Sequence, residues 1–377
     1  GNPAAARCRS GCPPPAAGQY YPMKLFFCQS CEQVLFFENT ACERCGHTLG
    51  YLPQDNELYA LDAMGNGLWQ PLEAGAHHTP RALCANNAHS ACNWLAEPGQ
   101  AYCVACSFNR TIPNLSVPGN TARWQKLEVA KHRLFYTLLR LGLPMHNRRE
   151  DPINGLAFDF LDSLPDGTPA MTGHMNGIIT IAMNETDDAQ REKKRQEMGE
   201  YYRTLLGHFR HEIGHYYWNV LIRDAGPDRL DACRAVFGDD RQDYATSLQA
   251  HYGAPASTDW RGHYVSHYAT SHPWEDFAET WAHYLHIIST LETAWAYRIS
   301  IDAAGAQAPP LSTSIRRDPY TEMSFDEITQ GWLPLTYAVN SLNRSMGLPD
   351  FYPFVLTPGI LRKLSFIHDL IRASRVG

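Results

Sequence analysis

The spacing of apolar and polar residues divides the chain into two parts of different character. Residues 23–115 contain short strand-like runs separated by turn residues and cysteines. From residue 121 onward, apolar positions recur with helical spacing up to Leu141, where Gly142 and Pro144 end the pattern. We therefore expect a turn-rich N-terminal module followed by a mainly helical body.

Two runs with alternating apolar side chains interrupt the helical body. Residues 156–160 and 178–182 alternate with a period of two, and Asn176-Gly177 supplies turn chemistry before the second run. We expect strands at about 155–161 and 177–183 that form a small sheet over the helices. The second strand is our candidate for an edge that binds extended substrate by β-augmentation.

These patterns predict an α+β fold in three segments. Residues 1–22 are rich in Pro, Ala and Gly, a composition that cannot bury a core, and are predicted to be a flexible leader. Residues 23–115 form the N-terminal module. Residues 116–377 form the larger domain, with helical patterns at 206–220, 277–291 and 361–371.

Composition and charge exclude some classes of protein. The 377 residues are 44% apolar and 19% charged, as in globular proteins, and no run reaches the roughly 18 apolar residues of a membrane span. The N-terminus lacks the features of a secretory signal, so we expect a cytoplasmic protein that does not enter membranes. A net charge of -7, from 32 basic and 39 acidic residues, argues against nucleic acid as a partner.

The cysteines indicate metal binding. Ten of the eleven precede residue 107, whereas a disulfide framework usually spreads along the domain that it links. Cys28-x2-Cys31 and Cys42-x2-Cys45 are two short pairs whose thiolates can converge on one zinc ion. We predict a first structural zinc at these four residues.

A second quartet follows, with less regular spacing. Cys84, Cys92, Cys103 and Cys106 are predicted to hold a second structural zinc, and His89 is a possible substitute ligand. Neither closed site is expected to catalyse a reaction. The module is net acidic, which suits protein contacts better than nucleic-acid binding. Cys8 and Cys12, in the leader, are interpreted as incidental.

The segment that carries chemistry is His211-Glu212-Ile213-Gly214-His215. Residues four apart on a helix lie one turn above each other, so both imidazoles can reach one zinc ion. Glu212 then lies beside the metal, where it can take a proton from a bound water. This pattern predicts a catalytic zinc site with Glu212 as general base.

A second cluster supplies candidates for the third ligand. Pro273 suits the first turn of a helix capped by Ser271 or His272, and Glu275 and Glu279 share a face of that helix. Two carboxylates on an apolar helix need a cation opposite them. Glu275 is predicted to bind the metal, and Glu279 to accept a hydrogen bond from a ligating histidine. The candidate ligands rank in the order Glu275, Glu279, Asp276, His272.

These segments resemble a known family. The runs HEIGHYYW and HPWEDFAETWAHYLH, behind MKLFFCQSC, are similar to bacterial zinc-binding metallopeptidases with an N-terminal zinc ribbon. The resemblance covers residue 23 to near the C-terminus. It implies a zinc-ribbon module and a gluzincin-type peptidase domain.

A more distant similarity concerns one tyrosine. In anthrax lethal factor-like gluzincins, a Tyr is followed by six residues and then by the ligand Glu, which begins a helix of the form Glu-Phe-Phe-Ala-Glu. In this sequence Tyr268 precedes Glu275 at the same spacing. Asp276 replaces an aromatic residue of that pattern. The similarity implies that Tyr268 stabilises the oxyanion, with Tyr264 and His272 as substitutes.

Together these features predict a zinc-dependent hydrolase of peptide bonds with one catalytic and two structural zinc ions. Its partners would be a peptide or protein substrate and, through the ribbons, possible partner proteins. Two alternatives remain open. The chain could be a zinc-ribbon adaptor with a non-catalytic or regulatory metal centre, or it could cleave isopeptide or other amide bonds in conjugated proteins.

Overall fold

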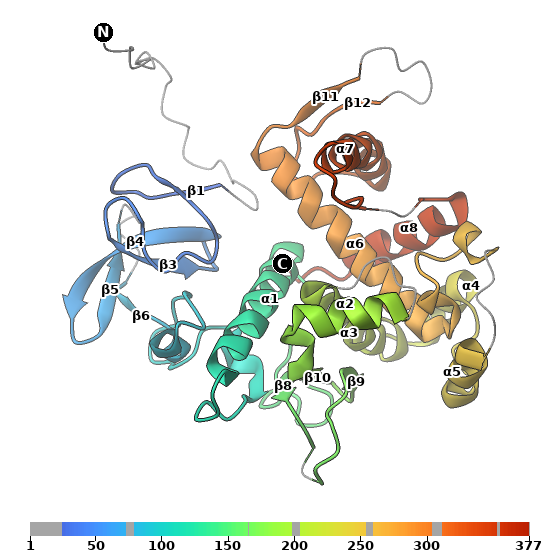
Figure 1. Cartoon of the computed structure of the whole chain (residues 1–377), viewed down its shortest axis with the longest axis horizontal. Coiled ribbons are helices and arrows are strands. Elements are labelled where there is room, and N and C mark those ends of the chain that lie inside the picture. The colour runs from blue at the N-terminus through green and yellow to red at the C-terminus, as the bar shows by residue number, and fades with distance from the viewer. Residues whose placement is uncertain are drawn as a thin grey trace.

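Figure 1 shows the computed structural model of the chain. The structure describes residues 25–72, 79–164, 166–197, 204–253, 259–303, 311–352 and 355–376. A group of short strands lies to one side of a larger, mainly helical body, so the predicted α+β fold is confirmed. The predicted leader, with Cys8 and Cys12, lies outside the described residues. The boundaries after residues 22 and 115 stay predictions.

The N-terminal module is built from two small antiparallel sheets. One pairs β1 (Phe26–Phe27) with β2 (Val34–Leu35), and the other has the order β3-β4-β5-β6. The strands of the second sheet are β3 (Thr48–Leu52), β4 (Glu57–Gly65), β5 (Leu68–Pro71) and β6 (Arg81–Ala82). Two short 3₁₀ turns, at Ala85–His89 and Cys106–Phe108, follow.

Helix α1 (Asn120–Leu141) lies between the N-terminal module and the other helices (Figure 1). Tyr136 on α1 packs edge-on against Phe37 of the module, with ring centroids 5.4 Å apart. Phe135, another buried side chain of α1, contacts Phe158 of the larger domain, with ring centroids 5.8 Å apart. The helix ends at Gly142, which has a left-handed φ of 65°, as the sequence predicts. The two parts therefore share one apolar core through α1.

The small sheet of the larger domain has the order β7-β8-β10-β9. Its strands are β7 (Asn109–Thr111), β8 (Ala157–Leu161), β9 (Gly173–Met175) and β10 (Ile178–Ala182). Both predicted strands are present, and Asn176 and Gly177 have φ values of 48° and 80° in the turn that joins β9 to β10.

The prediction that the second strand forms an edge of this sheet is wrong. β10 pairs in parallel with β8 and antiparallel with β9, so neighbours occupy both of its sides. The sequence lacked a strong signal for β9 because only three residues pair there. β9 takes the edge position instead.

The remaining elements are mostly helices. Their bounds are α2 (Asp188–Glu197), α3 (Leu205–Trp218), α4 (Pro227–Phe237), α5 (Tyr244–Gly253), α6 (Pro273–Ala296), α7 (Phe325–Ser345) and α8 (Pro358–Ala373). A hairpin of β11 (Ser300–Asp302) and β12 (Ser312–Ser314) lies beside α7 (Figure 1). In the described part of the chain, no helix has both the length and the apolarity needed to cross a bilayer.

Close packing of α3 on α6 positions the site. A Cβ atom added to Gly214 would lie 3.0 Å from the Cα atom of Ala278 and 3.3 Å from its carbonyl oxygen. Any larger side chain at residue 214 would push the two helices apart, because backbone atoms cannot give way as a flexible side chain can. Glycine between Glu212 and His215 therefore lets both helices bring their polar side chains together.

Candidate metal centres

The first candidate centre lies between α3 and α6. His211 and His215 project from α3, and Glu275 projects from the first turn of α6. The Nε2 atoms of the two histidines are 3.1 Å apart, and Oε2 of Glu275 lies 3.0 and 3.3 Å from them. Three donor atoms from two helices thus converge on one point.

This triangle suits a zinc ion. A tetrahedral zinc with N and O ligands at about 2.0–2.1 Å separates neighbouring ligand atoms by about 3.3–3.4 Å. The observed separations of 3.0 to 3.3 Å approach that value. Glu275 is buried, and its Oε2 faces both imidazole nitrogens. Burying a carboxylate costs free energy, and a cation shared with the two imidazole nitrogens would offset that cost.

Glu279 lies one turn further along α6. Its Oε1 faces Nδ1 of His211 at 2.7 Å, and its Oε2 accepts a hydrogen bond of 2.5 Å from the Ser266 hydroxyl. Burial raises the pKa of Glu279, but the bond to His211 outweighs it and leaves the pKa at about 2. An ionised Glu279 holds the His211 proton on Nδ1, so Nε2 is free to bind a metal. Ser266 has no sequence signature that would reveal this contact.

Glu212 points into the same region and is 7% exposed. Its Oε2 has no hydrogen-bond partner among the described residues. Burial raises its pKa to about 7, with further increases from the charges of Glu275 and Glu279 and a decrease from His211. A carboxylate in this environment is suited to accept a proton at neutral pH.

An aromatic side chain fixes the second histidine. Trp274 stacks on His215 with ring centroids 3.6 Å apart and an interplanar angle of 30°. His174 of β9 lies 6.2 Å from His215 and 6.3 Å from Trp274 between ring centroids. The sequence analysis did not assign a role to Trp274, although its position directly before Glu275 was the available signal.

Two tyrosines border the site. The Tyr244 hydroxyl donates a 2.7 Å hydrogen bond to Oε1 of Glu275, which leaves Oε2 directed at the histidines. The Tyr268 ring lies 5.9 Å from that of His211, and its hydroxyl interacts with that of Tyr244. Burial raises the pKa of Tyr268 far above its usual range, so it stays a hydrogen-bond donor. Tyr244 was missed because it precedes Glu275 by 31 residues, in another helix.

The lower-ranked candidates face elsewhere. Asp276 forms a 2.6 Å ion pair with Lys363 of α8. His272 caps α6, accepting a hydrogen bond from the Trp274 amide, and its Nε2 faces the Gln242 carbonyl oxygen. The Tyr264 ring packs under Lys363, 3.9 Å from its Nζ. In this structure none of these three residues joins the group formed by His211, His215 and Glu275.

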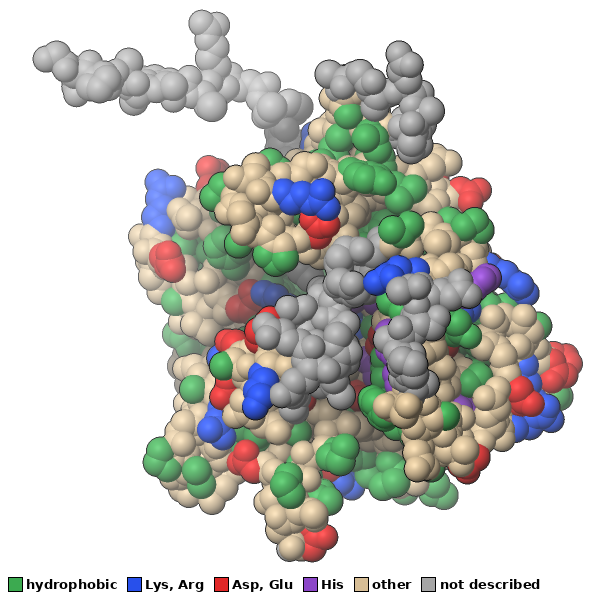
Figure 2. Space-filling model, turned by 45° about the vertical axis from the view of Figure 1, so that its right-hand side comes forward, with side chains coloured by type: hydrophobic (Ala, Val, Ile, Leu, Met, Phe, Trp, Pro, Cys, Tyr) green, Lys and Arg blue, Asp and Glu red, His purple; other side chains and the backbone are tan. Residues whose placement is uncertain are grey.

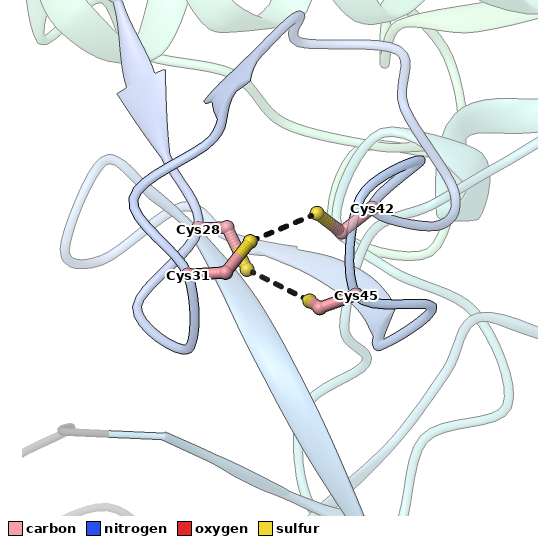
Figure 3. A group of neighbouring side chains, drawn as sticks. All are labelled: Cys28, Cys31, Cys42 and Cys45. Carbon is pink, nitrogen blue, oxygen red and sulfur yellow. Dashed lines mark hydrogen bonds between the residues drawn. The ribbon is translucent and has the colours of Figure 1, made fainter. Parts of the chain in front are cut away.

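The second candidate centre is the first cysteine quartet. Cys28 and Cys31 lie in one turn and Cys42 and Cys45 in another, and their sulfur atoms point toward one another (Figure 3). The Cys28–Cys45 and Cys31–Cys42 sulfur pairs are separated by 3.5 and 3.6 Å. A tetrahedral zinc ion with Zn–S bonds of about 2.3 Å places two sulfur ligands about 3.8 Å apart. Cys45 is exposed, so this centre lies at the surface of the module.

The third candidate centre is the second quartet. Cys84, Cys92, Cys103 and Cys106 are all buried, and their sulfur atoms lie within 4.8 Å of one another. The amides of Trp94 and Cys106 donate to the sulfurs of Cys92 and Cys103 at 3.3 and 3.4 Å. Such N–H···S bonds stabilise thiolates. His89, the suggested substitute, lies against Trp124 and does not join this group.

One face of the molecule is hollowed where histidines gather. Figure 2 shows purple histidine side chains inside a narrow recess near the middle of the face. Lysines and arginines on this face lie among acidic and apolar side chains.

A helix with His211 and His215, facing a glutamate on a second helix, defines a class of zinc-binding proteins to which many peptidases belong. Comparison with known families makes the assignment specific. The sequence model of the family described as "Putative zinc-binding metallo-peptidase" matches residues 120–370, and that of a zinc-ribbon domain matches residues 25–117. The chain belongs to this zinc-binding metallo-peptidase family and carries an N-terminal zinc ribbon, so the family resemblance predicted from the sequence is confirmed.

Similar proteins occur in mycobacteria. The chain is 40% identical over 351 residues to the uncharacterized proteins Rv2568c of Mycobacterium tuberculosis and Mb2598c of Mycobacterium bovis. In each case the match covers 93% of this chain and 95% of the relative. No solved structure matches the chain, and the similarity to lethal factor-like peptidases stays a prediction.

Proposed function

We propose that the protein is a zinc-dependent hydrolase that cleaves peptide bonds between α3 and α6. The observation that carries this proposal is the set of three convergent donors, His211, His215 and Glu275, beside the unpaired carboxylate of Glu212. Three protein ligands leave one position of a tetrahedral zinc open for water or substrate. Family membership supports a zinc hydrolase in general, and the roles of individual residues are our proposal.

Zinc at this centre would lower the pKa of a bound water and polarise the substrate carbonyl. Glu212 would accept a proton from the attacking water and later donate it to the leaving amine. Glu279 keeps the His211 proton on Nδ1, and Tyr244 holds Glu275 so that one carboxylate oxygen faces the centre. Tyr268 donates a hydrogen bond to the developing oxyanion.

The strand β9 is our candidate for substrate binding. It forms one edge of the four-stranded sheet, and His174 on this strand stands next to His215. An extended peptide that pairs with an edge strand gains main-chain hydrogen bonds without a fixed side-chain sequence. Its scissile bond would then pass close to the metal ligands.

The zinc ribbon has a separate role in this proposal. Its two cysteine quartets would each hold a structural zinc, which gives three zinc ions per chain together with the catalytic one. The predicted acidic character of the module supports contact with the protein substrate or with a partner protein, and not with nucleic acid.

A peptide-library digest tests the proposed activity. Purified protein is incubated with the library, and new termini are identified by mass spectrometry. Glu212→Gln should slow cleavage by about 10²- to 10⁴-fold while the zinc content stays unchanged. Glu185→Gln is a matched control, because Glu185 is also buried and contacts α3 through His208 at 3.3 Å. Cleavage by Glu212→Gln at the wild-type rate would refute the mechanism, and inactivity of the wild type toward peptides and isopeptide conjugates would refute the function.

A further inference from the structure

The second cysteine quartet has a neighbour that its spacing in the sequence does not reveal. His132 projects from α1, 26 residues after Cys106, and is 5% exposed. Its Nε2 atom lies 3.2 Å from the Cys92 sulfur, 3.6 Å from that of Cys106 and 4.0 Å from that of Cys103. One imidazole nitrogen therefore faces three of the four sulfurs.

The orientation of this ring is fixed by its other nitrogen. Nδ1 of His132 lies 2.6 Å from the Glu128 carbonyl oxygen and donates its proton there. The Glu128 side chain is held in turn by the indole N–H of Trp124 at 3.0 Å and by Lys131 at 2.8 Å. These contacts hold the ring so that Nε2 is directed at the sulfurs.

The distances fit a nitrogen ligand. A tetrahedral zinc with Zn–N near 2.0–2.1 Å and Zn–S near 2.3 Å places N and S about 3.5 Å apart. The three N–S distances of 3.2, 3.6 and 4.0 Å bracket that value. The Cys92–Cys103 sulfur separation of 3.7 Å is close to the roughly 3.8 Å of two thiolates on one zinc. Cys84 also lies within 4.8 Å of the other three sulfurs, so the group of Cys92, Cys103 and Cys106 has two neighbouring donors, Cys84 and His132, for a fourth position.

We propose that the second zinc centre has two alternative fourth ligands, Cys84 of the ribbon and His132 of α1, on a base formed by Cys92, Cys103 and Cys106. The match to the zinc-ribbon family ends at residue 117 and the match to the peptidase family begins at residue 120. When His132 is the fourth ligand, the zinc ion links the two parts, since ligands from both sides then share one ion.

Zinc content of single and double variants of the full chain tests the proposal. Cys84→Ser and Cys84→Ala should each keep the wild-type number of zinc ions, because His132 completes the site. His132→Ala should keep it as well, through Cys84. Cys84→Ser combined with His132→Ala should lose one zinc per chain. Cys84→Ser combined with His89→Ala is the matched control and should lose none, because His89 faces Trp124.

Cobalt substitution adds a spectroscopic readout that does not depend on activity. In Cys84→Ser, replacement of one sulfur by nitrogen should weaken the thiolate-to-cobalt charge-transfer absorption and move the d–d bands to shorter wavelength. The first quartet contributes equally to both samples, so the difference spectrum reports on the second centre. Loss of one metal ion from both Cys84→Ser and Cys84→Ala would overturn the proposal, and His132 would then be only a hydrogen-bond partner of the thiolates.

Discussion

The two cysteine centres and the histidine–glutamate centre differ in the number and origin of their donors. Each cysteine centre gathers four sulfurs from turns of the N-terminal module, whereas His211, His215 and Glu275 supply three donors from two helices. Four thiolates fill the coordination of a zinc ion, but three ligands leave a position for water. Under the proposed function, catalysis therefore belongs to the larger domain and the ribbon contributes stability.

The centres also differ in the unused polar groups around them. Near the cysteine quartets, amide N–H groups and His132 face the sulfurs. Beside the histidine–glutamate centre, Glu212 keeps an oxygen without a partner in the described structure. A buried carboxylate without a partner costs stability, which a proton-transfer role would explain.

The largest effect is expected at Glu212. Replacement by glutamine keeps the shape of the side chain but removes the proton acceptor, so kcat should fall by about 10²- to 10⁴-fold. Zinc content and melting temperature should stay near wild type, as measured by elemental analysis and calorimetry. An unchanged kcat would show that the histidine–glutamate centre does not use the Glu212 carboxylate.

Tyr268 should have the next largest effect. Tyr268→Phe should lower kcat by about 10²- to 10³-fold with little change in KM, the usual loss of one oxyanion donor. Tyr244→Phe is the matched control, because its hydroxyl bonds to Glu275 and its loss should weaken zinc affinity instead. If His272→Ala or Tyr264→Phe is impaired and Tyr268→Phe is not, the similarity to lethal factor-like peptidases assigns the wrong residue.

Glu279 should have a smaller effect. Glu279→Gln removes the charge that faces Nδ1 of His211, and outer contacts of this kind are worth about 10- to 100-fold in metal affinity or activity. A zinc titration against a competing chelator measures the affinity directly. An affinity equal to that of wild type would mean that Glu279 does not hold the ligand.

The smallest effect on catalysis is expected from the first cysteine centre. Cys42→Ser should remove one zinc ion and lower the melting temperature, while folded molecules keep the wild-type kcat. Steady-state kinetics on the purified folded fraction checks this. A loss of kcat as large as that of Glu212→Gln would contradict the assignment of catalysis to the histidine–glutamate centre alone.

The sequence predicted the features that depend on local spacing. The cysteine pairs, the helix with His211 and His215, and the turn at Asn176 and Gly177 each need only neighbouring residues, and the structure contains all of them. The resemblance to the family covered the same segments. Local spacing therefore sufficed for element types and for the grouping of the four cysteines of each quartet.

Contacts between distant segments could not be predicted in this way. Tyr244 reaches Glu275 across 31 residues, and His132 reaches Cys92 across 40, because helices pack on other elements. The position of β10 inside the sheet likewise depends on β9, a strand of only three residues. Such contacts follow from packing, which the pattern of one segment does not contain.

The zinc content of variants at two neighbouring residues tests the histidine–glutamate centre most directly. Glu275→Ala removes the proposed third ligand, and Asp276→Asn changes the adjacent carboxylate, which pairs with Lys363 instead. Elemental analysis should find one zinc ion fewer than wild type in Glu275→Ala and the wild-type number in Asp276→Asn. A full complement in Glu275→Ala together with a loss in Asp276→Asn would contradict the account.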